Sequence, residues 1–150
     1  MIVLFLDIDG CMISHEWRQV SNGFTPDCVV ALNDILHKTN ARIVITSSLR
    51  LDRTLQEMKE LFTFENVLPN RILGMTPFLD SDRGVEILRY LNESSQAIDD
   101  YVIIDDFMDD IEVYFSQEKI LEINPAKGLT FKDSEIIADR LNARRYYERS

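Results

Sequence analysis

Apolar and polar residues follow one another along this chain in blocks that predict strands and helices in turn. Short apolar runs closed by polar residues or glycine are typical of buried strands, whereas apolar residues three or four positions apart are typical of helices that cover a core. The runs predict five strands, over Ile2–Asp7, Arg42–Thr46, Arg71–Gly74, Tyr101–Asp105 and about Lys119–Ile123. The spaced positions predict four helices: from Pro26 to about Lys38, over Leu51–Phe62, one that Asp80 or Ser81 caps and that runs through Leu91, and one onward from Thr130 or Asp133.

Strands that alternate with helices of this length are typical of the α/β class. The expected architecture is a doubly wound, Rossmann-like central parallel sheet of about five strands with helices on both faces. The 150 residues contain no repeat, linker or low-complexity segment, and this length suits one core. Residues 1–150 are therefore expected to form a single domain.

Composition narrows the class of protein. The chain carries 26 acidic and 16 basic residues, a formal charge of −10, which argues against bulk, non-specific nucleic-acid binding. No apolar run reaches the length of a membrane span, and the N-terminal run has no basic flank and ends at Asp7, unlike a secretory signal. Cys11 and Cys28 do not form a disulfide framework. We therefore expect a cytoplasmic protein without membrane partners.

Polar residues gather where three of the predicted strands end. They are Asp7 and Asp9, then Thr46 and Ser47, then Asp105, Asp106 and Asp110. The carboxyl ends of neighbouring parallel strands meet at one edge, where open α/β sheets place their ligands. Clustered carboxylates repel one another unless a cation lies among them, and oxygen ligands without a Cys or His cluster favour Mg²⁺ over zinc. Because Mg²⁺ favours substrates that bring phosphate oxygens, the cluster predicts phosphate chemistry.

The motifs occur in an order that resembles one known superfamily. DIDG follows an apolar strand, ITSS follows the second, a basic residue comes later, and DD-x-x-x-D follows the fourth. This order is similar to that of the haloacid dehalogenase (HAD) superfamily and covers nearly the whole chain. ITSSLR, RGVEILRYL and KGLT make the chain most similar to the small HAD domains associated with RNA-repair proteins.

The resemblance implies roles for two acids and a hydroxyl. Asp7 would be the nucleophile that forms an aspartyl-phosphate, and it would also bind the metal. Asp9 would protonate the leaving oxygen and then activate water, while its backbone carbonyl touches the metal. Thr46 or Ser47 would hold the phosphoryl oxygens. DIDG alone also fits a turn, and both hydroxyl residues also fit helix caps.

The resemblance also implies a basic residue and further metal ligands. Arg83, in place of the commoner lysine, would neutralise the phosphoryl charge, with Lys127 in PAKGLT as the alternative. Arg83 also fits a solvated ion pair on its own helix. Asp106 and Asp110 align with the metal-binding acids, and Asp105 lies beside them. Asp110 also fits a first-turn acid that favours a helix dipole.

Many HAD enzymes carry a cap domain inserted after the first or third strand. Here only about fifteen residues separate Gly10 from the next predicted helix, so we expect a capless enzyme. The open site suits a nucleic-acid end or a phosphoprotein as substrate, and a small phosphomonoester is a further alternative. A nucleic-acid end would call for a local basic groove, from residues such as Arg18, Arg50, Arg53 and Arg83.

The expected function is Mg²⁺-dependent hydrolysis of a phosphomonoester through an aspartyl-phosphate. The acid at Asp9 favours a phosphatase, because dehalogenases of the superfamily lack an acid there. The alternative is a regulatory module that binds metal and phosphate without turnover.

Overall fold

The centre of the protein is a five-stranded parallel sheet of order β3-β2-β1-β4-β5. The computed structural model describes residues 1–149, and their side chains as far as residue 142. The strands are β1 (Ile2–Leu6), β2 (Arg42–Ile45), β3 (Ile72–Met75), β4 (Asp100–Asp105) and β5 (Ile120–Glu122). The predicted α/β class and doubly wound parallel sheet are confirmed.

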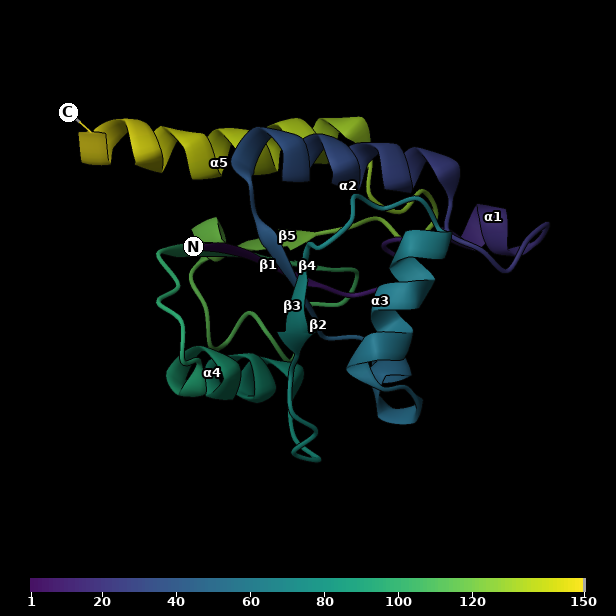
Figure 1. Ribbon diagram of the computed structural model, residues 1–150, viewed down its shortest axis with the longest axis horizontal. Coiled ribbons are helices and arrows are strands. Elements are labelled where there is room, and N and C mark those ends of the chain that lie inside the picture. The colour runs from purple at the N-terminus through teal and green to yellow at the C-terminus, as the bar shows by residue number, and fades with distance from the viewer. Residues whose placement is uncertain (150) are drawn as a thin grey trace.

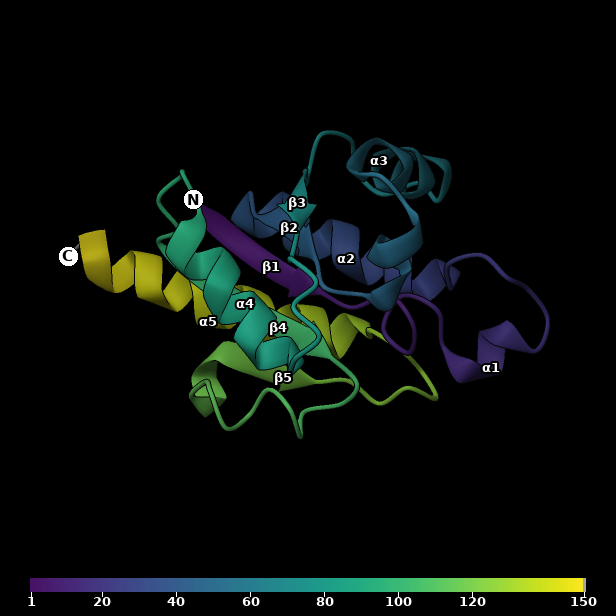
Figure 2. The ribbon, with the colours of Figure 1, turned by 90° about the horizontal axis from the view of Figure 1, so that it is seen from below.

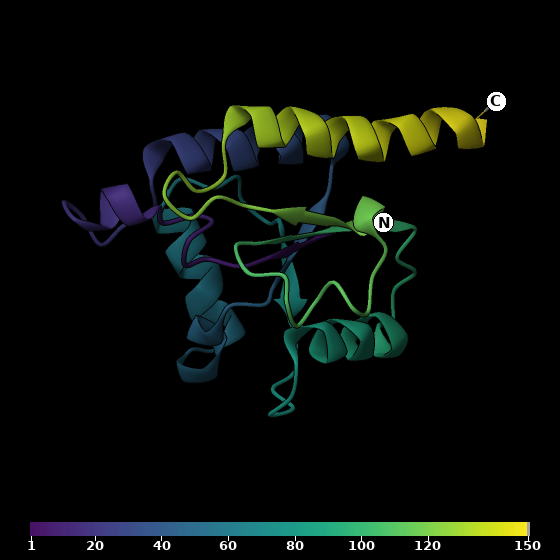
Figure 3. The same cartoon turned by 180° about the vertical axis from the view of Figure 1, so that it is seen from behind.

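Helices cover both faces of this sheet. The helices of the described residues are α1 (His15–Arg18), α2 (Pro26–Thr39), α3 (Leu55–Phe64), α4 (Arg83–Glu93) and α5 (Phe131–Arg149), with two 3₁₀ helices, η1 (Ser48–Asp52) and η2 (Gln117–Lys119). In Figures 1 and 3, α2 and α5 lie side by side over one face, while α4 lies against the opposite face. No helix within the described part of the chain is long and apolar enough to cross a membrane.

β1 is buried on both faces, which explains its unbroken apolar sequence. Leu4 and Leu6 belong to the core formed with α2, α3 and α5, whereas Val3 and Phe5 belong to the core formed with α4. Successive side chains of a strand point to opposite faces, so one short segment contributes to both cores. The end of β1 is therefore held firmly from two sides.

The starts of two helices differ from the prediction. The segment predicted as one helix from Leu51 is divided into η1 and α3, because Thr54 and Glu57 form a capping box that begins a new helix. The next helix begins at Arg83, and its N-cap residue is Asp82, not the predicted Asp80 or Ser81. Asp80 has a left-handed backbone with φ of 51°, which places it in the turn before the helix.

The chain order creates a crevice at the carboxyl ends of β1 and β4. From β1 the chain reaches β2 through α2 on one face, and it reaches β4 through α4 on the other. Open α/β sheets bind ligands at such a reversal of strand order. Between β1 and α2 the chain adds only α1, which lies beyond the tip of β1 in Figure 2. The described residues include no cap domain over this crevice.

Candidate active site

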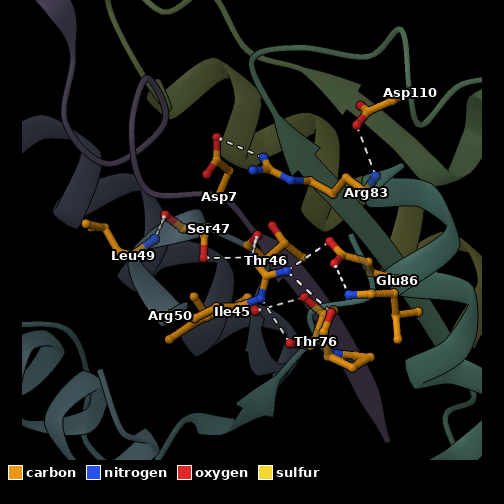
Figure 4. Close-up of polar contacts among 12 residues, drawn as sticks. Asp7, Ile45, Thr46, Ser47, Leu49, Arg50, Thr76, Arg83, Glu86 and Asp110 are labelled. Carbon is orange, nitrogen blue, oxygen red and sulfur yellow. Dashed lines mark hydrogen bonds and ion pairs between the residues drawn. The ribbon is translucent and has the colours of Figure 1, made fainter. Parts of the chain in front are cut away.

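Asp7 lies directly after β1, and its side chain is fixed from two directions. The residue is 5% exposed. Its Oδ1 accepts a hydrogen bond from the Ile8 N–H at 2.9 Å, and its Oδ2 lies 3.4 Å from Arg83 Nη1. Figure 4 shows Asp7 and Arg83 facing each other across the site. One carboxylate oxygen is thus oriented by the backbone and the other by a cation.

Arg83 joins Asp7 to the end of β4. Its Nη1 donates to Asp105 Oδ2 at 2.6 Å, and Asp105 Oδ1 accepts the Phe107 N–H at 3.0 Å. Arg83 is the first residue of α4, where its backbone N–H donates to Asp110 Oδ2 at 3.0 Å. The carbonyl of Asp110 also accepts the Gly84 N–H at 3.1 Å. Asp110 therefore anchors the start of the helix that carries Arg83.

These groups border a cavity of about 260 Å³. The cavity is lined by Asp7, Asp9, Ser48, Arg83, Asp105, Asp106, Phe107 and Asp110. All five predicted acids thus come together at one place, as the strand order requires. Asp9 is exposed and forms an ion pair with Arg18 of α1, so the predicted general acid lies on the loop that follows β1, at the exposed side of the cavity.

The two candidate hydroxyls differ in their hydrogen bonding. Thr46 is bound to the residue before Asp7, because its N–H donates to Leu6 O at 3.0 Å. Its Oγ1 is buried and has no hydrogen-bond partner among the described residues. Ser47 Oγ accepts the Leu49 N–H at 3.3 Å and so caps η1. A buried hydroxyl normally has a partner, so of the two predicted residues Thr46 is the one with a free hydroxyl, although the cavity itself is lined by the residue after them, Ser48.

The basic residues are divided between several places. Arg83 lies against Asp7, whereas Lys127 forms an exposed ion pair with Glu16 at 3.1 Å. Arg50 is 7% exposed and pairs with Glu86 at 2.9 Å, and both residues line, with Arg83, a neighbouring hollow of about 480 Å³. The Arg50–Glu86 contact spans 36 residues, and no local sequence pattern marks it.

A divalent cation fits the acids nearest Gly10. Ligand atoms of Asp7, Asp106 and Cys11 lie within 4.8 Å of one another. Burial raises the pKa of the Cys11 thiol well above its usual value, so the protonated sulfur does not suit a hard cation. Gly10 has φ of 79°, and a Cβ atom there would collide with the Asp106 carboxylate. Glycine at this turn therefore lets Asp106 approach Asp7, and the two carboxylates form an oxygen set suited to Mg²⁺.

Two buried acids of the cavity, Asp7 and Asp105, hold their protons more tightly than usual. Burial, and then the charge of Asp105, raise the pKa of Asp7 to about 7, although Arg83 opposes the shift. Burial raises the pKa of Asp105 to about 6, again against Arg83. Burial lowers the pKa of Arg83 itself, but Asp105 and Asp7 outweigh this effect and raise it above its usual value. The site thus concentrates more negative charge than one guanidinium neutralises.

The parallel sheet and the acid cluster agree with a HAD-like domain, and this family supports, at a coarse level, a hydrolase of the phosphatase type. The chain belongs to the family described as "HAD domain in Swiss Army Knife RNA repair proteins", whose model matches residues 3–134. The resemblance found in the sequence is thereby confirmed. HAD domains generally use Mg²⁺, in agreement with the possible metal-binding cluster. No curated protein and no solved structure matches the chain.

Proposed function

We propose that this protein is a Mg²⁺-dependent phosphomonoester hydrolase that works through an aspartyl-phosphate at Asp7. The observation that carries the proposal is the position of Asp7. It is a buried carboxylate that borders a cavity, with one oxygen held by the Ile8 N–H and the other beside Arg83. An oriented carboxylate within a cationic contact is suited to attack phosphorus.

In the proposed reaction a phosphoryl group passes to Asp7 and then to water. An Asp7 oxygen forms a bond to phosphorus while the bond to the leaving oxygen breaks, and Asp9 gives its proton to that oxygen. Asp9 then takes a proton from water, which attacks the same phosphorus and breaks the bond to Asp7. The exposed position of Asp9 in the cavity lining supports this role, because water can reach its carboxylate there.

Two further groups would bind the phosphoryl oxygens. The Thr46 hydroxyl is buried and lacks a partner among the described side chains, so it has a proton to donate to a bound oxygen. The Arg83 guanidinium already contacts Asp7 and brings the positive charge that a transferring phosphoryl group requires. Ser47 would retain its role as the cap of η1.

Asp7 and Asp106 would hold Mg²⁺, with Asp9 contributing its backbone carbonyl. When bound, Mg²⁺ would neutralise charge shared by these acids and the phosphoryl oxygens. Asp105 faces Arg83, and Asp110 faces the start of α4. We therefore assign these two acids to the placement of Arg83, although both also line the cavity.

The apparent affinity for Mg²⁺ should fall as the solution becomes more acidic. Protons and Mg²⁺ compete for the Asp7 carboxylate, whose pKa is raised to about 7 in the metal-free protein. Between about pH 8 and about pH 6 we expect a roughly tenfold weakening, because most Asp7 side chains are then protonated. Calorimetric titration with MgCl₂ at several pH values measures this. An affinity independent of pH would contradict metal binding by Asp7.

For the substrate we favour the phosphorylated end of a nucleic acid. The family description, which places this domain in RNA repair proteins, supports this choice, and the absence of a cap from the described residues leaves room for a large substrate. Phe107 lines the cavity and is 57% exposed, so it is available to stack on a base. The net charge of −10 disfavours many contacts to phosphates, so we expect the protein to contact only the terminal nucleotides of the nucleic acid.

Phosphate release with Mg²⁺ tests this function. The substrates would be 3′- and 5′-phosphorylated oligonucleotides, nucleotides, a phosphopeptide and an aryl phosphate, each with and without excess EDTA. We expect EDTA-sensitive turnover that is fastest on one oligonucleotide end. After acid quenching, the enzyme itself should carry a phosphoryl group that hydroxylamine removes. Absence of turnover on every substrate, with Mg²⁺ still bound, would contradict the proposal and favour a regulatory binding module.

A further inference from the structure

Arg50 lies on η1, just outside the catalytic cavity, yet its charged side chain is almost completely buried. Its side chain is 5% exposed and that of its partner Glu86 is 6% exposed. Moving a guanidinium and a carboxylate out of water costs free energy, and the cost is offset only when their hydrogen-bonding groups are satisfied. The partners of Arg50 therefore indicate what the buried charge achieves.

All five N–H donors of the Arg50 guanidinium have acceptors, and four of the acceptors are backbone carbonyls. Nε donates to Thr76 O (2.9 Å), Nη1 to Thr46 O (2.7 Å) and Ser47 O (2.9 Å), and Nη2 to Pro77 O (3.4 Å) and Glu86 Oε1 (2.9 Å). Thr46 and Ser47 follow β2, and Thr76 and Pro77 follow β3. Figure 4 shows this side chain between the two strand ends and α4. One residue thus links three segments of the chain.

Glu86 extends the link into the helix that carries Arg83. Its Oε2 accepts the Leu79 N–H at 2.9 Å, which fixes the turn before α4. Glu86 lies three positions after Arg83, and residues three apart lie on the same side of a helix. On the other side, Asp110 binds the first N–H groups of α4. Both the position and the rotation of the first turn of α4 are therefore constrained.

Thr46 is the residue through which the link reaches the end of β1, where Asp7 lies. Its N–H donates to Leu6 O, directly before Asp7, and its carbonyl accepts from Arg50. Both polar groups of its backbone are thus held, while its hydroxyl remains without a partner among the described residues. Losing Arg50 would release this backbone on one side and α4 on the other.

We propose that Arg50, paired with Glu86, is a positioning residue that holds the Thr46 hydroxyl and the Arg83 guanidinium in fixed places around Asp7. This inference rests on the proposed phosphatase function. Arg50 does not touch the reacting atoms. It acts through two groups that do, and a small displacement of such groups costs much of the rate.

The test compares Arg50→Lys with Arg89→Lys. Arg89 and Glu93, both on α4, form an exposed ion pair, which serves as a matched arginine–glutamate pair outside the site. Lysine keeps the charge of Arg50 but has three donors in place of five. We expect Arg50→Lys to lower kcat at least about tenfold and to weaken inhibition by inorganic phosphate, while Mg²⁺ affinity stays within about twofold. Arg89→Lys should match the wild type in kcat, in inhibition by inorganic phosphate and in Mg²⁺ affinity.

Chemical rescue separates positioning from folding. In Arg50→Ala, millimolar guanidinium chloride should restore part of kcat, because the ion can enter the space that the side chain leaves, and methylammonium should not. If the Arg50 variants do not fold, Glu86→Gln provides the same comparison, since it keeps the shape of the side chain and loses one acceptor.

Wild-type turnover, measured on the same substrate, distinguishes the two proposals. An inactive wild type would overturn the phosphatase function and this inference with it. An active wild type with an equally active, folded Arg50→Lys would overturn only the positioning role. So would a rescue in which guanidinium raises the melting temperature of Arg50→Ala and leaves its kcat unchanged.

Discussion

Asp7→Asn should abolish phosphate release, lowering kcat by at least about 10³-fold. Asparagine has nearly the same shape and can still accept the Ile8 N–H, so the fold around β1 should be preserved. The amide is a poor nucleophile and carries no charge for Mg²⁺ or Arg83. Phosphate release, together with acid-quenched labelling of the protein, measures both the rate and the loss of the phosphorylated intermediate.

Asp139→Asn is the matched control, because Asp139 is an exposed acid on α5, outside the cavity. It should retain wild-type turnover and labelling. A variant of Asp7 that kept more than about a tenth of the wild-type kcat would rule out nucleophilic attack by this residue. Wild-type labelling in that variant would assign the covalent intermediate to another side chain.

Arg83→Met should destabilise the metal-free protein by about 3–5 kcal/mol near neutral pH. Arg83 lies between Asp7 and Asp105, which are 5% and 1% exposed, and its removal leaves two buried carboxylates without a cation. Methionine keeps most of the length of the side chain, so the loss reports charge more than packing. Urea denaturation with and without Mg²⁺ measures the free energy of unfolding, and Mg²⁺ should restore part of the loss.

The sign of the pH dependence gives an independent check. The pKa values of Asp7 and Asp105 are raised in the folded protein, to about 7 and about 6, so protonation favours the folded state over the unfolded one. The penalty in Arg83→Met should therefore shrink as the pH falls through these values. Arg89→Met, which breaks an exposed pair, should cost less than about 1 kcal/mol at any pH. Equal losses in the two variants would contradict a charge-bridging role for Arg83.

The elements that determine the fold could be predicted from local patterns. The apolar run of β1 and the helix that starts at Pro26 are confirmed close to their predicted bounds, because periodic burial is written directly into a sequence. The start of α3 at Leu55 was missed. Ser47 and Thr54 both act as caps, and which of two neighbouring caps begins the longer helix depends on packing of the whole segment.

By itself, the sequence determined the α/β class, the parallel sheet and the family, since these follow from apolar periodicity and from short motifs at strand ends. Only the tertiary structure decided the partners of the polar side chains. Asp105 turns to Arg83 while the adjacent Asp106 lies near Asp7, and Arg50 contacts Glu86 across 36 residues. Such pairings depend on how remote segments meet in space. A linear pattern shows which residues are buried, whereas only the folded chain shows what each buried charge faces.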